Sequence, residues 1–213
     1  MITRRGANIG LLASAAMAAA GGLASAQELQ ALDLPPPQSE GGKPVIEALR
    51  LRRLIREYSP RALSPRVLSD LLSAASGINR PTSGDRTAPY WRHVMVIDIY
   101  LAMVDVVWLH EPEGAQAAGT PAQKYSRRDR HAGFVAKAPL NLVYVAHGER
   151  MDDISAEDRR LYAWVDTDFI GQNVYPLCTS EGLAIVFRAA LDYTKLARTT
   201  ELGTGQFVTF AQS

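Results

Sequence analysis

The sequence predicts an α+β sandwich, because helical and strand-like patterns are mixed without a regular strand–helix–strand alternation. Amphipathic helical patterns occupy residues 45–58, 66–76 and 156–178, whereas mostly apolar runs occupy 94–107 and 140–146. The chain has 213 residues, of which 47% are hydrophobic and 21% charged. This composition is typical of a folded domain with a substantial core.

The N-terminal residues have the pattern of an export signal. Arg4 and Arg5 precede an alanine-rich apolar stretch, and Ala24-Ser25-Ala26 forms a small-residue cleavage site. We therefore expect a signal peptide at 1–26 and a periplasmic or secreted protein, with a retained anchor or an unstructured leader as the alternatives. The paired arginines resemble a twin-arginine signal, although Gly6-Ala7-Asn8 matches that pattern poorly.

Residues 27–43 are rich in proline, glycine and polar side chains, and they predict a linker. The folded domain is expected at 44–213. Its first helix is predicted over residues 45–58, after Pro44 and with apolar residues at helical spacing. A second helix is expected at 66–76, with Ser64 as its N-cap and Gly77 at its end.

The following segments are predicted from local composition. Residues 79–90 indicate a loop, 94–107 a buried strand, 111–119 an exposed turn and 140–146 a second buried strand. Ser155 and Asp158 predict the start of a long helix ending near Cys178, with Pro176 kinking or terminating it. The remaining elements are predicted as a strand at 183–187, a helix at 193–202 and a strand at 206–211.

Charge and special residues exclude several function classes. The formal net charge of +1 predicts no nucleic-acid binding and no polybasic membrane surface. Cys178 is the one cysteine, which rules out an intramolecular disulfide, and we expect it to be a buried thiol rather than a nucleophile. The four histidines lack the spacing of metal ligands, so no metal site is predicted.

Arginines cluster in the first predicted helix. Arg52 and Arg56 are four residues apart, and Arg53 and Arg56 are three apart, so on a helix their guanidinium groups converge. A phosphate group accepting paired hydrogen bonds fits such a cluster. The alternative is a solvated basic face that pairs in part with Glu47 and Glu57.

Several sequence blocks, taken in their order along the chain, give a more specific indication of fold and function. The arginine segment is followed by "LSDLLSAASGINRP" (68–81), "RTAP" (86–89), "IDIYLAM" (97–103), "FVAKAPLNLVYVA" (134–146), "FIGQNVY" (169–175) and "SEGLAIVFRAALD" (180–192). In this order and spacing the chain resembles the flavin-dependent nitroreductase-like family, and most closely its branch related to SagB-type dehydrogenases. The blocks cover most of residues 45–212.

The resemblance implies a mostly antiparallel sheet flanked by helices, in an intertwined homodimer that holds flavin mononucleotide (FMN) at the subunit interface. It implies that NAD(P)H reduces the flavin, which passes electrons to a nitro compound, quinone or similar small acceptor. Arg52, Arg53 and Arg56 match the positions that contact the flavin phosphate and ring edge. Glu181 and Gly182 match the pair that lies against the ring. No protein side chain is expected to act as a catalytic nucleophile, and no stable membrane span is expected after signal removal.

Several residues depart from the family pattern. Leu54 stands where a serine is usual, and Tyr90, His93 and Met95 stand where serine, asparagine and glutamine are usual. His93 retains the capacity for one hydrogen bond to the ring, so it is included among the expected flavin contacts. These changes support an alternative, a non-catalytic protein of the same fold that has lost normal flavin binding and binds a ligand or partner.

Overall fold

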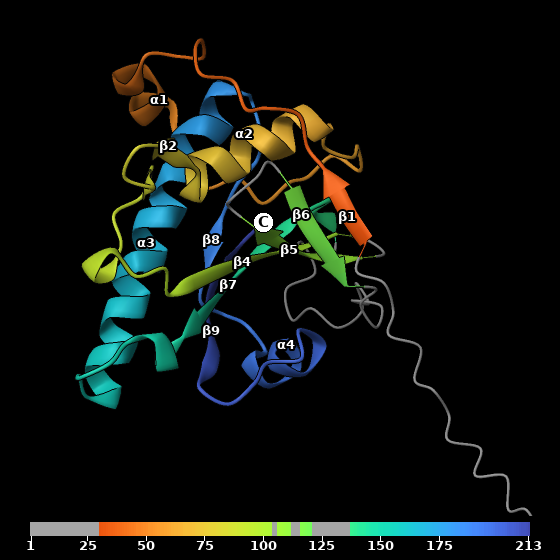
Figure 1. The fold of residues 1–213 in the computed structure, drawn as a ribbon. Coiled ribbons are helices and arrows are strands. Elements are labelled where there is room, and N and C mark those ends of the chain that lie inside the picture. The colour runs from red at the N-terminus through yellow and green to blue at the C-terminus, as the bar shows by residue number, and fades with distance from the viewer. Residues whose placement is uncertain (1–29, 104–105, 112–115, 121–136) are drawn as a thin grey trace, which may run out of the picture.

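The computed structural model describes residues 30–103, 106–111, 116–120 and 137–213 (Figure 1). Its centre is a seven-stranded sheet in the order β1-β6-β5-β4-β7-β9-β8, and every neighbouring pair is antiparallel. The strands are β1 (Gln30–Asp33), β4 (Ile97–Ala102), β5 (Val107–Glu111), β6 (Gln116–Thr120), β7 (Asn141–His147), β8 (Phe187–Arg188) and β9 (Gln206–Gln212). The predicted α+β class and the mostly antiparallel sheet are confirmed. The predicted signal peptide lies outside the described residues.

Helices cover both faces of the sheet. The helices are α1 (Val45–Leu51), α2 (Pro65–Ser76), α3 (Ala156–Ser180) and α4 (Tyr193–Thr199), with the short 3-10 turns η1 (Trp91–His93) and η4 (Gly148–Arg150). Because side chains alternate along a strand, β7 contributes to two cores. Leu142, Tyr144 and Ala146 join the cluster that contains buried residues of α2 and α3. Val143 and Val145 pack on the other face with Leu196 of α4.

The caps of the two main helices agree with the sequence prediction. The backbone N–H of Val67 donates to the Ser64 hydroxyl at 3.3 Å, and that of Asp158 donates to the Ser155 hydroxyl at 3.0 Å. Pro176 does not terminate the helix, because α3 continues through it to Ser180. Proline removes only one N–H donor, and the last turn is closed by the Glu181 N–H, which donates to the Leu177 carbonyl at 2.9 Å.

The predicted helix at 45–58 is too long. α1 ends at Leu51, and Arg52 already has an extended backbone with ψ of 131°. Ala48 is the one α1 residue that is buried, so packing supplies little reason for the helix to continue. Instead, the Ile55 N–H donates to the Ile185 carbonyl at 3.1 Å, which holds residues 52–58 against the segment after α3.

Strand boundaries differ more than helix boundaries. The apolar run at 94–107 contains β4 and the first residue of β5, and the N–H of Met103 donates to the Val106 carbonyl between them. Part of the turn expected at 111–119 is β6, which pairs with β5. The loop expected at 79–90 includes a small hairpin of β2 (Ile78–Arg80) and β3 (Asp85–Arg86).

Two further segments are corrected. The strand expected at 183–187 is reduced to β8, which consists of Phe187 and Arg188. Residues 30–33, within the expected linker, form β1 and pair with β6. The chain after β1 is also attached to the domain, because Leu34 is buried and the Ser69 hydroxyl donates to the Pro35 carbonyl at 2.5 Å.

Candidate functional site

The end of α3 brings together most of the residues predicted to bind a cofactor. Arg52 lies over the ring of Tyr175, with its Cζ atom 4.9 Å from the ring centroid. Tyr175 belongs to the last turns of α3, and Glu181 and Gly182 follow the final turn. This cluster is therefore formed by the extended segment after α1 and the C-terminal end of α3.

The three arginines have different surroundings. Arg53 is exposed and turns back to α1, where its Nη1 donates to the carbonyls of Arg50 at 3.0 Å and Arg52 at 2.8 Å. Its charge is thus placed at the negative end of that short helix. Arg56 is exposed, and its positive charge acts on Tyr58 and Tyr175. Since α1 ends at Leu51, these residues do not share the helical face that their spacing predicted.

Glu181 and Gly182 each line a different cavity in the protein surface. Gly182 lines a mainly apolar cavity of about 510 Å³, and Glu181 lines a more polar groove of about 380 Å³. Gly182 has a φ of +69°, a conformation that favours glycine, and a Cβ at this position meets no atom within 4 Å. Its backbone is therefore open to a close approach by a ligand.

The apolar cavity lies between the sheet, α2 and the end of α3. Its wall includes Leu63, Leu71, Leu140, Leu142, Val174 and Ile185, with Glu57 and Arg61 as charged members. Cys178 also lines it, and burial raises the pKa of this thiol to about 12. A thiol with that pKa remains protonated at neutral pH, which agrees with the expected structural role of Cys178.

His93 is placed away from the arginines. Its ring is largely exposed, contacts Asp85 through Nδ1 at 3.1 Å and meets the Tyr90 ring edge-on at 5.7 Å. The adjacent Trp91 N–H donates to Asp166, nine residues before Tyr175 on α3. Nine helical residues correspond to a rise of about 13 Å, so within one chain the segments that carry His93 and Arg52 contact α3 at two separate positions.

Tyr175 is a contributor that the sequence did not single out. It stands within the "FIGQNVY" block, where its aromatic character is typical of a core helix. The side chain is 6% exposed, and its hydroxyl accepts a hydrogen bond from the Phe187 N–H at 2.7 Å. No local pattern relates Tyr175 to Arg52, since the contact depends on where the chain leaves α1.

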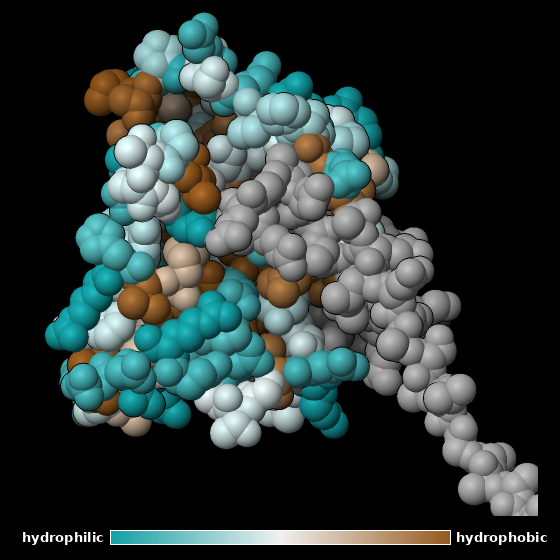
Figure 2. Space-filling model, in the orientation of Figure 1, coloured by the Kyte–Doolittle hydropathy of each residue, from teal (hydrophilic) through white to brown (hydrophobic). Residues whose placement is uncertain are grey.

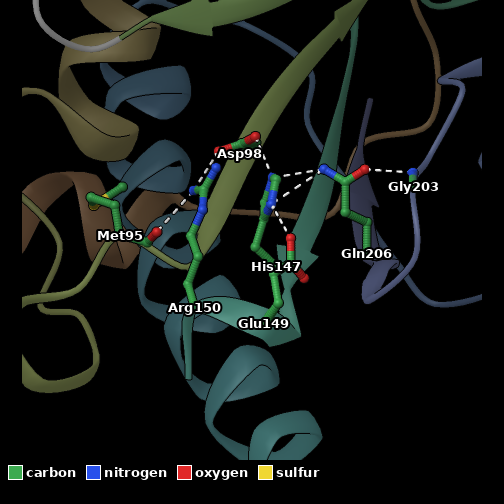
Figure 3. Close-up of polar contacts among 7 residues, drawn as sticks. All are labelled: Met95, Asp98, His147, Glu149, Arg150, Gly203 and Gln206. Atoms are coloured by element: carbon green, nitrogen blue, oxygen red, sulfur yellow. Dashed lines mark hydrogen bonds and ion pairs between the residues drawn. The ribbon is translucent and has the colours of Figure 1, made fainter. Parts of the chain in front are cut away.

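A second polar cluster lies at the C-terminal end of β7, around His147 (Figure 3). The His147 ring contacts Asp98 through Nε2 at 2.6 Å and Glu149 through Nδ1 at 3.0 Å. The amide nitrogen of Gln206 lies 2.9 Å from Nε2 of His147, and Arg150 reaches Asp98 at 3.1 Å. This network joins β4, β7, η4 and β9, and it stabilises the end of the sheet that is remote from Arg52.

Comparisons with known proteins agree with this fold. The profile of the nitroreductase family matches residues 49–212. A candidate nitroreductase of Methanocaldococcus jannaschii is 30% identical over 159 residues, which are 67% of this chain and 80% of that protein. The crystal structure of a candidate nitroreductase from Ralstonia eutropha superposes with a TM-score of 0.79 at 31% identity, covering 86% of this chain and 87% of that one.

An NADPH:FMN oxidoreductase from Vibrio harveyi, solved with NAD⁺, shares the fold at a TM-score of 0.56 and 16% identity, over 79% of this chain and 66% of that one. Its low identity supports the fold alone. The profile match extends over nearly all of the domain, and the Ralstonia structure resembles it in both sequence and shape. The chain belongs to the nitroreductase family.

Proposed function

We propose that this protein is an oxidoreductase that binds FMN, takes reducing equivalents from NAD(P)H and delivers them to a nitro compound, a quinone or a similar small acceptor. The observation that carries the proposal is the position of Arg52. Arg52 is half-buried with its guanidinium beside Tyr175, and no described residue forms a hydrogen bond or ion pair with that group. A partly buried cation with unused donors favours an anionic ligand.

The residues at the end of α3 fit FMN chemically. Arg52 offers donors to a phosphate, and Gly182 offers open backbone beside an apolar cavity. FMN supplies the capacity to accept a hydride and release electrons, which the side chains of this site lack. The role left to the chain is to bind, orient and partly desolvate the cofactor.

We further propose that two copies of the chain form the complete site. Exposed apolar residues gather on α1 and α3, and Figure 2 shows the α1 part as a brown patch. On α3 the exposed set is Leu161, Tyr162, Trp164, Val165 and Phe169. An exposed apolar surface on two adjoining helices favours association. A second copy also provides a way for the region of His93 to approach the arginines of its partner.

A second candidate function is a non-catalytic protein of this fold. The observation that favours it is Leu54, whose apolar side chain is 51% exposed within the arginine segment. A side chain of this type offers no hydrogen bond to a phosphate. In this alternative the cleft binds another ligand or a protein partner.

Export is also proposed, on the signal-like residues 1–26. Among the helices that the structure describes, none combines the length and apolar character needed to cross a bilayer. A mass measurement on protein recovered from the periplasm tests the proposal, with an N-terminus at Gln27 as the expected result. Retention of residues 1–26 in a cytoplasmic protein contradicts it.

The absorbance spectrum of the purified full chain separates the two functions. The oxidoreductase proposal expects flavin bands after incubation with FMN and gel filtration, and their bleaching by NADH or NADPH under anaerobic conditions. A protein that stays colourless contradicts FMN binding and supports the non-catalytic alternative. A protein that binds FMN but is not bleached by either nicotinamide contradicts the proposed electron donor.

A further inference from the structure

Tyr175 is fixed in its place by the protein around it. The residue is 6% exposed, and its hydroxyl accepts the Phe187 N–H at 2.7 Å, which ties the ring to the start of β8. Its position on α3 is reinforced by Val174 and Cys178, which are buried in the same core. A ring held by a helix on one side and a strand on the other has little freedom to move.

Arg52 lies over this fixed ring. A guanidinium group is attracted to an aromatic face by the ring quadrupole, and this attraction uses none of its five N–H donors. At 4.9 Å between Cζ and the ring centroid, Arg52 is well within range of that attraction. The ring therefore restricts the long arginine side chain while leaving its donors available for a planar, bidentate contact.

The two neighbouring arginines have surroundings that differ from those of Arg52. Arg53 uses Nη1 on two backbone carbonyls, so its guanidinium is directed to the end of α1. Arg56 adds positive charge near the same ring. The charges of Arg52 and Arg56 both oppose the rise that burial causes in the pKa of Tyr175. Two cations thus act on one aromatic ring, and Arg52 lies over the face of that ring.

We propose that Tyr175 is a positioning residue that holds the Arg52 guanidinium ready for a phosphate monoester, and that it thereby makes the site prefer FMN over riboflavin. The identification of the phosphate as that of FMN rests on the proposed function. The role of Tyr175 concerns the phosphate end of the ligand alone, so its effect is separable from recognition of the flavin ring.

Two substitutions at one position test this role. Tyr175→Phe and Tyr175→Leu both remove the hydroxyl that accepts the Phe187 N–H, but only the phenylalanine keeps the ring face. We expect the Phe variant to keep the wild-type ratio of FMN to riboflavin affinity, measured by fluorescence titration. We expect the Leu variant to bind FMN about threefold to tenfold more weakly, with riboflavin affinity unchanged.

The Arg52→Gln variant provides the matched control. It should lose the FMN preference by itself, and adding Tyr175→Leu should then have no further effect on the ratio, because the two residues act through one contact. Equal FMN-to-riboflavin ratios in the Phe and Leu variants overturn the proposal. An additive effect in the double variant also overturns it. Tyr175→Met replaces the Leu variant if that protein does not fold, as judged by circular dichroism.

Inorganic phosphate and phenyl phosphate make the test independent of flavin chemistry. Titration of each folded variant, followed by its thermal midpoint, should show stabilisation of the wild type and of Tyr175→Phe and a reduced effect in Tyr175→Leu. If the wild type binds neither flavin but shows this series, the proposed function fails and the role of Tyr175 stands. If the wild type binds no phosphate compound at all, the role of Tyr175 is overturned.

Discussion

The backbone N–H of Trp91 donates to the Oδ2 atom of Asp166 at 2.9 Å, and this hydrogen bond joins the segment after "RTAP" to the middle of α3. The Trp91 ring also meets Tyr162 of the same helix at 6.3 Å between centroids. These contacts hold η1 against α3 at a distance from Arg52. They place His93 and the arginines in separate parts of one chain, which is the geometric reason for proposing a site shared by two copies.

Asp166 should make stability depend on pH. Burial raises the pKa of this carboxyl to about 6, although the Trp91 N–H opposes the rise. Because the folded-state pKa lies above the unfolded value, the folded protein binds the proton more readily, and stability increases as pH falls through about 6. Asp166→Asn keeps an acceptor for Trp91 and removes this titration.

The measurement is urea unfolding of wild type and Asp166→Asn at pH 7.5, 6 and 5. The stability of the variant relative to wild type should be highest at pH 7.5 and should decrease toward pH 5, as the wild-type carboxyl becomes neutral. A relative stability that is the same at all three pH values would contradict the assignment.

Gly171 should not tolerate a side chain. A Cβ at this position would lie 2.5 Å from Cε2 of Phe187, far inside van der Waals contact. The Phe187 ring is itself packed against Phe210, with 4.9 Å between centroids, so it has little room to retreat. Gly171→Ala is expected to destabilise the fold by about 1–3 kcal/mol in urea unfolding.

Gln172→Ala is the control for this prediction, because Gln172 is exposed one residue later on the same helix. Its effect should stay within about 0.5 kcal/mol. Adding Phe187→Leu should recover part of the loss caused by Gly171→Ala, since the two residues are in contact. Equal stability of the two alanine variants would be inconsistent with the crowding described here.

Leu54 is expected to limit phosphate binding. Its side chain is 51% exposed in the segment that carries the arginines. Leu54→Ser adds a hydroxyl group where the family usually has one, and a neutral hydrogen bond contributes about 0.5–1.5 kcal/mol. We therefore expect FMN affinity to rise about twofold to tenfold, as measured by fluorescence titration.

Leu54→Ala separates the hydroxyl group from the loss of apolar bulk. The alanine variant should bind FMN like the wild type, and riboflavin affinity should be the same in all three proteins. If alanine and serine raise FMN affinity equally, bulk and not hydrogen bonding is the limiting factor.

The elements that the sequence predicts best are those with local signals. α2 and α3 begin at capping serines whose hydroxyls accept N–H donors three residues later, and such caps depend on neighbouring residues alone. The sequence predicts too long a first helix because the apolar spacing continues to Ile55, whereas in the fold Ile55 forms a tertiary hydrogen bond to Ile185. The sequence does not predict β6, because its residues have weak strand preference and are held by pairing with a neighbouring strand.

The candidate site shows the same contrast between features that local sequence predicts and features that depend on tertiary contacts. Ordered motifs predict Arg52, Glu181 and Gly182 as cofactor contacts, and the fold brings these residues to one end of α3. The converging helical face assigned to the arginines is absent, because their backbone is extended after Leu51. The partnership of Arg52 with Tyr175 spans 123 positions in the numbering (175 minus 52), and no periodic pattern reports a contact between such distant residues.

The apolar face of α3 gives the last prediction. Trp164 is 46% exposed and Phe169 is 45% exposed, although both are large apolar side chains on a well-formed helix. Replacing both with glutamate places charges on the proposed contact surface, where burial of an unpaired carboxylate is unfavourable. Sedimentation velocity should show wild type at the mass of two chains and the double variant at the mass of one.

Arg198→Glu reverses an exposed charge on α4, outside this face, and it should leave the mass of two chains unchanged. Circular dichroism should be the same for all three proteins, because the replaced side chains contribute little to the core of a single chain. FMN affinity should fall with the loss of the dimer if the second copy completes the site. A wild-type protein that sediments as a single chain and still binds FMN would contradict the shared site.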